Sequence, residues 1–331
     1  MTRALVCHGA GDIRVEPREA GPPGPGEALV RLTRGGICGS DLHYWRHGGF
    51  GAIRIREPMV LGHEAAGVVE AAGEGVGLAP GTPVALNPSL PCGACDRCAA
   101  GLPNHCREMR FFGSAMRMPH VQGAFREAIT VEAARCVPAP GLDPAKAALA
   151  EPLAVCLHAL GRAGALAGRR VLVTGCGPIG CLTVAAAVAE GAEVVAVDPV
   201  AQARDHALAM GAARDAAPGE EGEGFHVAFE CSGAPPALAA CVAALEPRGV
   251  LVQLGLGGDM TVPVQAITAK EIDLRGSFRF HDAFARAVEA LATGRIDPAP
   301  LVTHALPLDE AEVAFALAAD RTRAMKVQLA F

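Results

Sequence analysis

The chain has 331 residues, which is long enough for two domains that each bury a hydrophobic core. Hydrophobic residues make up 51% of the chain and charged residues 19%, and 25 prolines with 40 glycines suit short strands joined by turns. The net charge is -6, and nothing in the sequence suggests the basic face that a nucleic-acid-binding protein usually carries. Residues 1–7 lead into turn residues without an apolar signal segment, so we expect a cytoplasmic protein.

One uncharged run, residues 171–189, reaches the length of a membrane span. Glycines and a proline near its middle interrupt it, so a strand, a turn and a helix explain it better, and we expect no membrane insertion.

Residues 1 to about 140 read as short strands and turns, with strands expected at 28–32 and 65–70. The pattern changes near residue 145. A helix is expected at 147–163, followed by buried strands at 171–173, 194–197, 227–229 and 250–254. Helices near 282–292 and 309–319 and a strand at 326–331 complete the chain. This alternation predicts a doubly wound parallel sheet after a mostly β domain.

A first candidate metal site lies between residues 36 and 64. Cys38, His63 and Glu64 offer the sulfur, nitrogen and oxygen ligands of a zinc ion that keeps an open position for a substrate. Ser40 and His43 stand beside Cys38 and could handle a proton. The alternative is a buried cysteine with unrelated His and Glu residues, which these residues alone do not exclude.

A second candidate metal site is a cluster of four cysteines within fifteen residues. Its members are Cys92, Cys95, Cys98 and Cys106. Two-residue gaps let a tight turn direct neighbouring sulfurs at one ion, and four thiolates leave no open position, so the predicted role is a structural zinc. The alternatives are a pair of disulfides, which a cytosolic protein disfavours, and a zinc ribbon for nucleic acid, which the acidic balance disfavours.

A glycine-rich turn follows the strand expected at 171–173 and opens a helix. Gly175 permits the turn, Gly177 lets the backbone approach a pyrophosphate, and Gly180 lets the helix pack on the strand. Asp198 comes about 20 residues after the turn, where an acid accepts ribose hydroxyls, so NAD is favoured over NADP. Arg204 lies close enough to weaken that preference, although a helical surface position is its simpler explanation.

These three features, in this order, resemble the zinc-dependent medium-chain dehydrogenase/reductase family over essentially the whole chain. The resemblance implies a GroES-like mostly β catalytic domain and a Rossmann NAD-binding domain, an α/β architecture with boundaries at 1–153, 154–277 and 278–331. It places Cys38, His63 and Glu64 at the catalytic zinc, the four-cysteine cluster at the structural zinc, and Glu151 where sorbitol dehydrogenases supply a further ligand, directly or through water.

Within the family, several segments are most similar to the L-idonate 5-dehydrogenases. They are residues 109–116, 119–121, 275–280 and 325–331. The chain departs from that group at residues 122–125, Gln-Gly-Ala-Phe, and in the loop 47–51, so the substrate is less determined than the reaction. The expected partner is a polyol or aldonate, and the alternative is a sorbitol or other secondary-alcohol dehydrogenase.

The resemblance also implies roles for single residues. Ser40 would take the proton of the substrate hydroxyl and His43 would pass it to solvent. Glu64 and Glu151 are assigned as catalytic residues as well as zinc ligands. The cofactor contacts are assigned to Gly175, Gly177, Pro178, Ile179, Gly180, Asp198, Arg204, Leu254, Phe278 and Arg279. The residues themselves add two calls. Tyr44, beside the proposed site, would contact the substrate, with ordinary packing as the alternative. A substrate carboxylate would pair with Arg110, Arg117 or Arg279, among which the sequence does not choose and of which Arg279 is our assignment.

We expect each chain to bind two zinc ions and to use NAD, with NADP as the alternative cofactor. We expect the protein to assemble as a homotetramer or a homodimer. From a different class of function, a non-catalytic relative would use the fold as a scaffold or a cofactor sensor. It would not need the set of Cys38, His63, Glu64, Ser40 and His43.

Overall fold

A computed structural model describes all residues, 1–331. The chain divides into two compact units, described separately below. Unit 1 comprises Met1–Glu151, Phe284–Thr293 and Val302–Phe331, and unit 2 comprises Pro152–Ala283 and Gly294–Leu301. Domain boundaries at 153 and 277 stay a prediction, because compactness alone does not define an independently folding domain.

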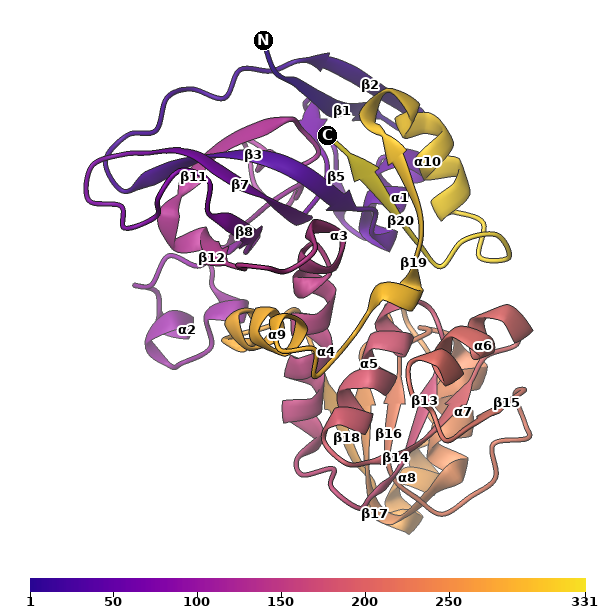
Figure 1. Cartoon of the computed structure of the whole chain (residues 1–331). Helices are drawn as coiled ribbons and strands as arrows, with labels where there is room; N and C mark the ends of the chain where they lie inside the picture. The colour runs from indigo at the N-terminus through magenta and orange to yellow at the C-terminus, as the bar shows by residue number, and fades with distance from the viewer. The chain divides into compact units, whose positions relative to one another are not determined.

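Unit 1 is built on a seven-stranded sheet in the order β12-β8-β7-β3-β20-β19, with β11 paired to β3 (Figure 1). Its strands are β3 (Glu27–Gly36), β7 (Glu64–Ala72), β8 (Pro83–Leu86), β11 (Ala128–Glu132), β12 (Cys136–Pro138), β19 (Val302–Pro307) and β20 (Lys326–Ala330). The last strand of the chain therefore pairs with one of the first, antiparallel to β3. The strands expected at 28–32, 65–70 and 326–331 are confirmed.

Smaller elements surround this sheet. A three-stranded sheet joins β1 (Arg3–Gly9), β2 (Asp12–Pro17) and β6 (Met59–Val60), and two short pairs join β4 (Gly49–Phe50) to β5 (Ile53–Arg54) and β9 (Ser89–Leu90) to β10 (Arg110–Phe111). The helices are α1 (Gly39–His47), α2 (Asp96–Ala99), α3 (Pro144–Ala147), α9 (Ala283–Ala292) and α10 (Ala311–Ala318). Buried apolar side chains, among them Phe125, Phe315 and Leu329, form the core that holds α1 and α10.

Unit 2 is a six-stranded parallel sheet in the order β15-β14-β13-β16-β17-β18. Its strands are β13 (Arg170–Thr174), β14 (Glu193–Val197), β15 (Arg214–Ala216), β16 (Phe225–Glu230), β17 (Leu245–Gln253) and β18 (Asp273–Gly276). Its helices are α4 (Ala150–Ala163), which begins in unit 1, α5 (Pro178–Ala189), α6 (Ala201–Ala209), α7 (Pro235–Ala244) and α8 (Val264–Lys270).

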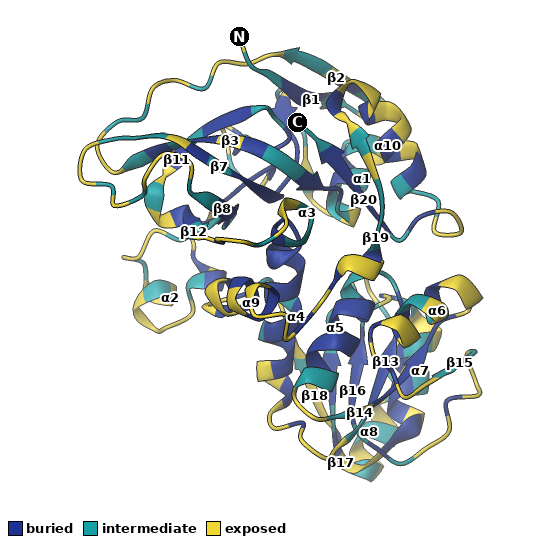
Figure 2. Ribbon diagram, viewed as in Figure 1, coloured by how far each residue is buried: buried dark blue, intermediate teal, exposed yellow.

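The strand order of unit 2 reverses between β13 and β16. Because crossovers between parallel strands are right-handed, helices of the two halves cover opposite faces of the sheet. The central strands β13, β14 and β16 are buried along most of their length (Figure 2). This is the doubly wound α/β architecture predicted from the sequence, and ligands bind at such a reversal, outside the carboxyl ends of the strands.

No helix in the structure combines the length and apolarity needed to cross a membrane.

Candidate active site and metal centres

Cys38, His63 and Glu64 lie together in unit 1, and their ligand atoms all fall within 4.8 Å of one another. Cys38 precedes α1, and Glu64 is the first residue of β7, paired in register with Gly36 of β3. A thiolate, an imidazole and a carboxylate this close together fit a zinc ion. Because the three side chains converge, they are not unrelated residues that happen to lie near one another in the sequence. The assignment of these three residues as ligands stays a prediction.

The turn before α1 is fixed by Asp41, which is fully buried. Its Oδ2 accepts a hydrogen bond from the Cys38 amide at 3.0 Å, and its Oδ1 accepts one from the Gly62 amide at 3.1 Å. The two segments that carry Cys38 and His63 are thereby joined through one carboxylate. The distance from His63 Nδ1 to Asp41 Oδ1 is 3.8 Å, too long for a hydrogen bond, so Asp41 braces the turn and does not hold the ring.

The neighbourhood of His63 is strongly anionic. Burial lowers the pKa of His63, but the charges of Asp41, Cys38 and Glu151 outweigh burial and bring the pKa well above its usual value. Glu151 stands in the first turn of α4, 6% exposed, and lies outside the compact set of three. An anionic pocket of this kind fits a divalent cation.

A residue that sequence reasoning missed is Lys326, on β20. Its side chain is 3% exposed, and its Nζ lies 2.6 Å from Glu64 Oε1 and 2.5 Å from Oε2, with hydrogen-bond geometry only to Oε1. It also donates to the Ile37 carbonyl at 3.1 Å. Burial lowers the pKa of Lys326, but Glu64, Cys38 and Glu151 raise it above its usual value. Lys326 therefore balances part of the negative charge of the site.

The proton-handling candidates both stand on α1, three residues apart and so on neighbouring positions of one helix face. Ser40 is partly exposed and His43 is exposed, with its ring 6.0 Å from the rings of His47 and Phe50. Tyr44 is 1% exposed, and its hydroxyl accepts a hydrogen bond from the Ala115 amide at 3.0 Å. Substrate contact by Tyr44 stays a prediction, and packing is the role that the contacts describe.

The four cysteines of the second cluster also have all their sulfurs within 4.8 Å of one another. None forms a disulfide, and Cys95 Sγ lies 3.9 Å from Cys106 Sγ. Backbone amides point at the sulfurs, with Cys92 N and Glu108 N at 3.2 and 3.3 Å from Cys106 Sγ. Amides of Arg107 and Cys98 lower the pKa of Cys95 to about 6. Burial and the neighbouring cysteines raise the pKa of Cys98 to about 12, so only part of the cluster favours thiolates without a metal. Four converging sulfurs fit a tetrahedral zinc with no open position.

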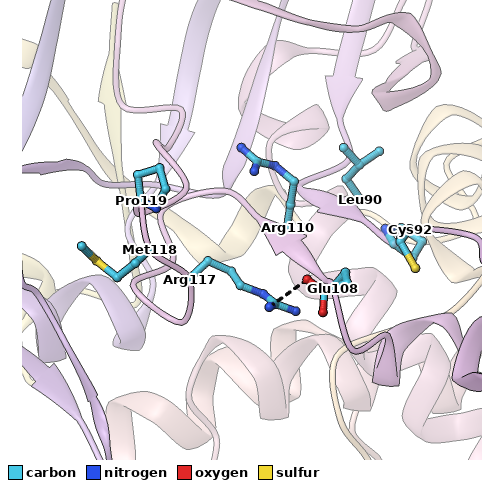
Figure 3. A pocket seen from close by; sticks show the side chains of 8 residues that line it. Leu90, Cys92, Glu108, Arg110, Arg117, Met118 and Pro119 are labelled. Atoms are coloured by element: carbon cyan, nitrogen blue, oxygen red, sulfur yellow. Dashed lines mark ion pairs between the residues drawn. The ribbon is translucent and has the colours of Figure 1, made fainter. Parts of the chain in front are cut away.

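A pocket of about 450 Å³ lies beside the four-cysteine cluster (Figure 3). It is lined by Leu90, Pro91, Cys92, Glu108, Arg110, Arg117, Met118 and Pro119. Arg117 is engaged there in an ion pair with Glu108 at 3.0 Å. The lining contains none of Cys38, His63, Glu64 and Glu151.

In unit 2 the glycine-rich turn lies between β13 and α5. Gly175 has φ +86, which a residue with a side chain rarely adopts, and a Cβ at Gly180 would overlap the Gly175 carbonyl. Pro178 and Ile179 form the first turn of α5, whose free amides suit a phosphate. Asp198 follows β14, 1% exposed, and accepts from Cys176 N at 2.8 Å and Val200 N at 2.9 Å.

Arg204 on α6 is not a free surface charge. Its Nε donates to Asp215 at 2.8 Å, and its Nη1 donates to the Asp198 carbonyl at 2.8 Å. Leu254 follows β17, and Phe278 and Arg279 follow β18, where the Arg279 guanidinium lies 5.0 Å from the Phe278 ring centroid. Their contacts with a cofactor or substrate stay predictions.

Comparison with known proteins places these features in a family. Residues 24–141 match the alcohol dehydrogenase GroES-like domain, and residues 178–293 match the zinc-binding dehydrogenase domain. The chain belongs to the zinc-dependent medium-chain dehydrogenase/reductase family, and it is an oxidoreductase of that family that acts on CH–OH groups. The predicted fold class, family and need for zinc are confirmed.

Among individual relatives, the chain is 46% identical to the L-idonate 5-dehydrogenase (NAD(P)(+)) of Escherichia coli (strain K12), over 92% of this chain and 91% of that protein. It is 38% identical to the sorbitol dehydrogenase of Gallus gallus, over 94% of this chain and 92% of that protein. The crystal structure of L-idonate 5-dehydrogenase from Escherichia coli superposes with a TM-score of 0.94 at 43% identity, covering 100% of this chain and 98% of that one.

Proposed function

We propose that this protein oxidises a secondary alcohol of a sugar acid with NAD, as an L-idonate 5-dehydrogenase that forms 5-keto-D-gluconate. The observation that carries the proposal is the 46% identity to a protein of that activity along 92% of the chain. The convergence of Cys38, His63 and Glu64 supports a catalytic protein rather than a non-catalytic relative.

The metal-site residues have a clear division of labour in this proposal. Cys38, His63 and Glu64 hold the zinc, with Glu151 as a further ligand or as a group that acts through water. A bound zinc ion supplies a Lewis acid that makes the substrate hydroxyl more acidic. Ser40 Oγ would accept the hydroxyl proton as it releases its own, and the exposed His43 imidazole would pass that proton to solvent. Lys326 keeps Glu64 in place through its ion pair.

For the cofactor, Gly175, Gly177 and the first turn of α5 bind the pyrophosphate, and Asp198 accepts the ribose hydroxyls. Bound NAD supplies the hydride acceptor. The carboxylate of Asp198 disfavours a 2′-phosphate, and Arg204 is already paired with Asp215, so NAD is the proposed cofactor and NADP the weaker alternative.

The aldonate carboxylate needs a cation, and Arg279 is the residue we assign to it, with Arg110 and Arg117 as the alternatives. The second candidate substrate is sorbitol or L-iditol, favoured by the 38% identity to sorbitol dehydrogenase. Assembly as a homotetramer or homodimer remains part of the proposal, and β18 offers an unpaired edge for it.

Cys38→Ser tests the proposed ligand set. Because a hydroxyl is a poor substitute for a thiolate on zinc, we expect turnover to fall at least about a thousandfold while NAD binding, measured by calorimetry, stays within about twofold. Cys7→Ala is the control, since Cys7 is a buried thiol outside both metal sites. Full activity in Cys38→Ser would contradict the assignment.

A further inference from the structure

Glu230, the last residue of β16, is a completely buried carboxylate with 0% exposure and no ion-pair partner. Its Oε1 accepts from Ser232 N at 2.8 Å and from Gly233 N at 3.1 Å, and it also contacts Ser232 Oγ. Its Oε2 accepts from Gly233 N at 3.0 Å and from Gln253 Nε2 at 2.5 Å. Groups that can donate hydrogen bonds surround both oxygens, which suits the ionised form and offsets the cost of burying it.

This carboxylate joins two loops at the carboxyl ends of neighbouring strands. Residues 231–233 follow β16, and residues 254–257 follow β17. The Glu230 carbonyl also accepts from Leu254 N and Gly255 N, each at 2.9 Å. The two loops interlock so closely that a Cβ at Gly255 or Gly257 would overlap the backbone of Gly233.

The same loops reach the glycine-rich turn. A Cβ at Gly175 would lie 2.7 Å from both Cβ and N of Ser232, so loop 231–233 packs directly on that turn. Gln253 adds a second sign of a ligand: its Nε2 donates to Glu230 and to the Gly255 carbonyl, whereas its buried Oε1 has no partner in the chain. Glu230 thereby fixes the orientation of the amide and leaves its buried Oε1 without a partner inside the chain.

The strand order assigns a part of the cofactor to these loops. Asp198 follows β14, on one side of the reversal between β13 and β16, and β16 and β17 lie on the other side. A dinucleotide that puts its adenosine ribose at Asp198 and its pyrophosphate at Gly175 extends its other half over β16 and β17.

We propose that Glu230 is a positioning residue for the nicotinamide half of the cofactor, acting by holding loops 231–233 and 254–257 and the Gln253 amide against the glycine-rich turn. This inference rests on the proposed use of NAD.

The test compares Glu230→Gln with the parent protein, using calorimetric titration with NAD and with AMP. A glutamine at this position turns an NH₂ group toward the donors of Gly233 or Gln253, so the loops lose at least one charge-assisted hydrogen bond. We expect the Kd for NAD to rise about tenfold and the Kd for AMP, which lacks the nicotinamide half, to stay within about twofold. Glu221→Gln is the matched control, because Glu221 is also a buried carboxylate, bonded to Gly219 N at 2.7 Å in another loop of the same unit.

Gln253→Ala provides a second variant that leaves the buried carboxylate and its backbone bonds in place. It is expected to weaken NAD binding several-fold and to leave AMP binding unchanged. Unchanged NAD affinity in both variants, or an equal loss for NAD and AMP in Glu230→Gln, would overturn the positioning role. Absence of NAD binding in the parent protein would overturn the proposed function and this inference with it.

Discussion

Lys326 illustrates what a single residue contributes to the first metal site. An ammonium group that is 3% exposed contacts a carboxylate that is 1% exposed, and both belong to strands that flank β3. Gly36 of β3 makes room for the pair, because a Cβ there would overlap Glu64 Oε2. Removing one partner of such a pair leaves a buried charge without compensation.

Lys326→Met in zinc-free protein is therefore expected to lower the free energy of unfolding by about 3–5 kcal/mol, measured by urea denaturation in the presence of a chelator. The double variant Lys326→Met with Glu64→Gln removes both charges and is expected to recover most of that loss. Equal stability of Lys326→Met and the parent protein would show that the ion pair contributes little.

Residues were predictable where the motif was local. Cys38, His63 and Glu64 could be proposed because their ligand types suit zinc and the family resemblance places them there, and their side chains do converge. Lys326 could not, because it is 262 positions away from Glu64 and only the pairing of β20 with β3 brings it there. Asp41 stands three residues after Cys38, where a carboxylate could orient His63 or brace the turn, and its hydrogen bonds favour the brace.

The turn that joins β13 to α5 shows how an element depends on a glycine. Gly180 stands in the first turn of α5, against the Gly175 carbonyl, so a methyl group would force the helix away from the strand. The strand, the turn and the helix were all predictable from contiguous sequence, since glycine spacing and the buried strand run reinforce each other. The packing of loop 231–233 on Gly175 was not, because no contiguous motif encodes it.

Gly180→Ala is expected to weaken NAD binding at least tenfold, measured by calorimetry, because the turn that approaches the pyrophosphate must shift. Gly161→Ala is the control, since nothing lies within 4 Å of a Cβ at Gly161 on helix α4. That control should leave NAD binding unchanged and raise stability by up to about 1 kcal/mol. Unaltered NAD affinity in Gly180→Ala would contradict the pyrophosphate assignment.

The four-cysteine segment is an element with little core of its own. Its apolar support consists of Met109 and Phe111 packed with Cys95, Cys98 and Cys106, and α2 spans only four residues. A segment that buries so little apolar surface depends on its metal for order.

Cys95→Ser is expected to lower the zinc content from about two ions per chain to about one, measured by atomic emission, because one of four thiolates is lost. Limited proteolysis should then cut within residues 92–106 while the first site keeps its zinc. Two zinc ions in Cys95→Ser, with the segment still resistant to protease, would argue against a structural metal.

For the whole molecule, the two units divide the chemistry. Unit 1 carries both cysteine-containing clusters, and unit 2 carries the glycine-rich turn, Asp198 and the Glu230 loops. Alternation of strands and helices predicted the architecture because parallel sheets need crossover helices. The identity of the substrate is harder to predict from the sequence. An aldonate carries a carboxylate where a polyol carries a hydroxymethyl group, and one well-placed cation, rather than the fold, distinguishes the two.

The most direct test of the central claim is kcat/KM for L-idonate, L-iditol and sorbitol, each with NAD and with NADP, on zinc-loaded protein. The account predicts that L-idonate with NAD exceeds both polyols by at least about tenfold, because one charge-assisted hydrogen bond to the carboxylate distinguishes them. Equal or higher values for the polyols would contradict it.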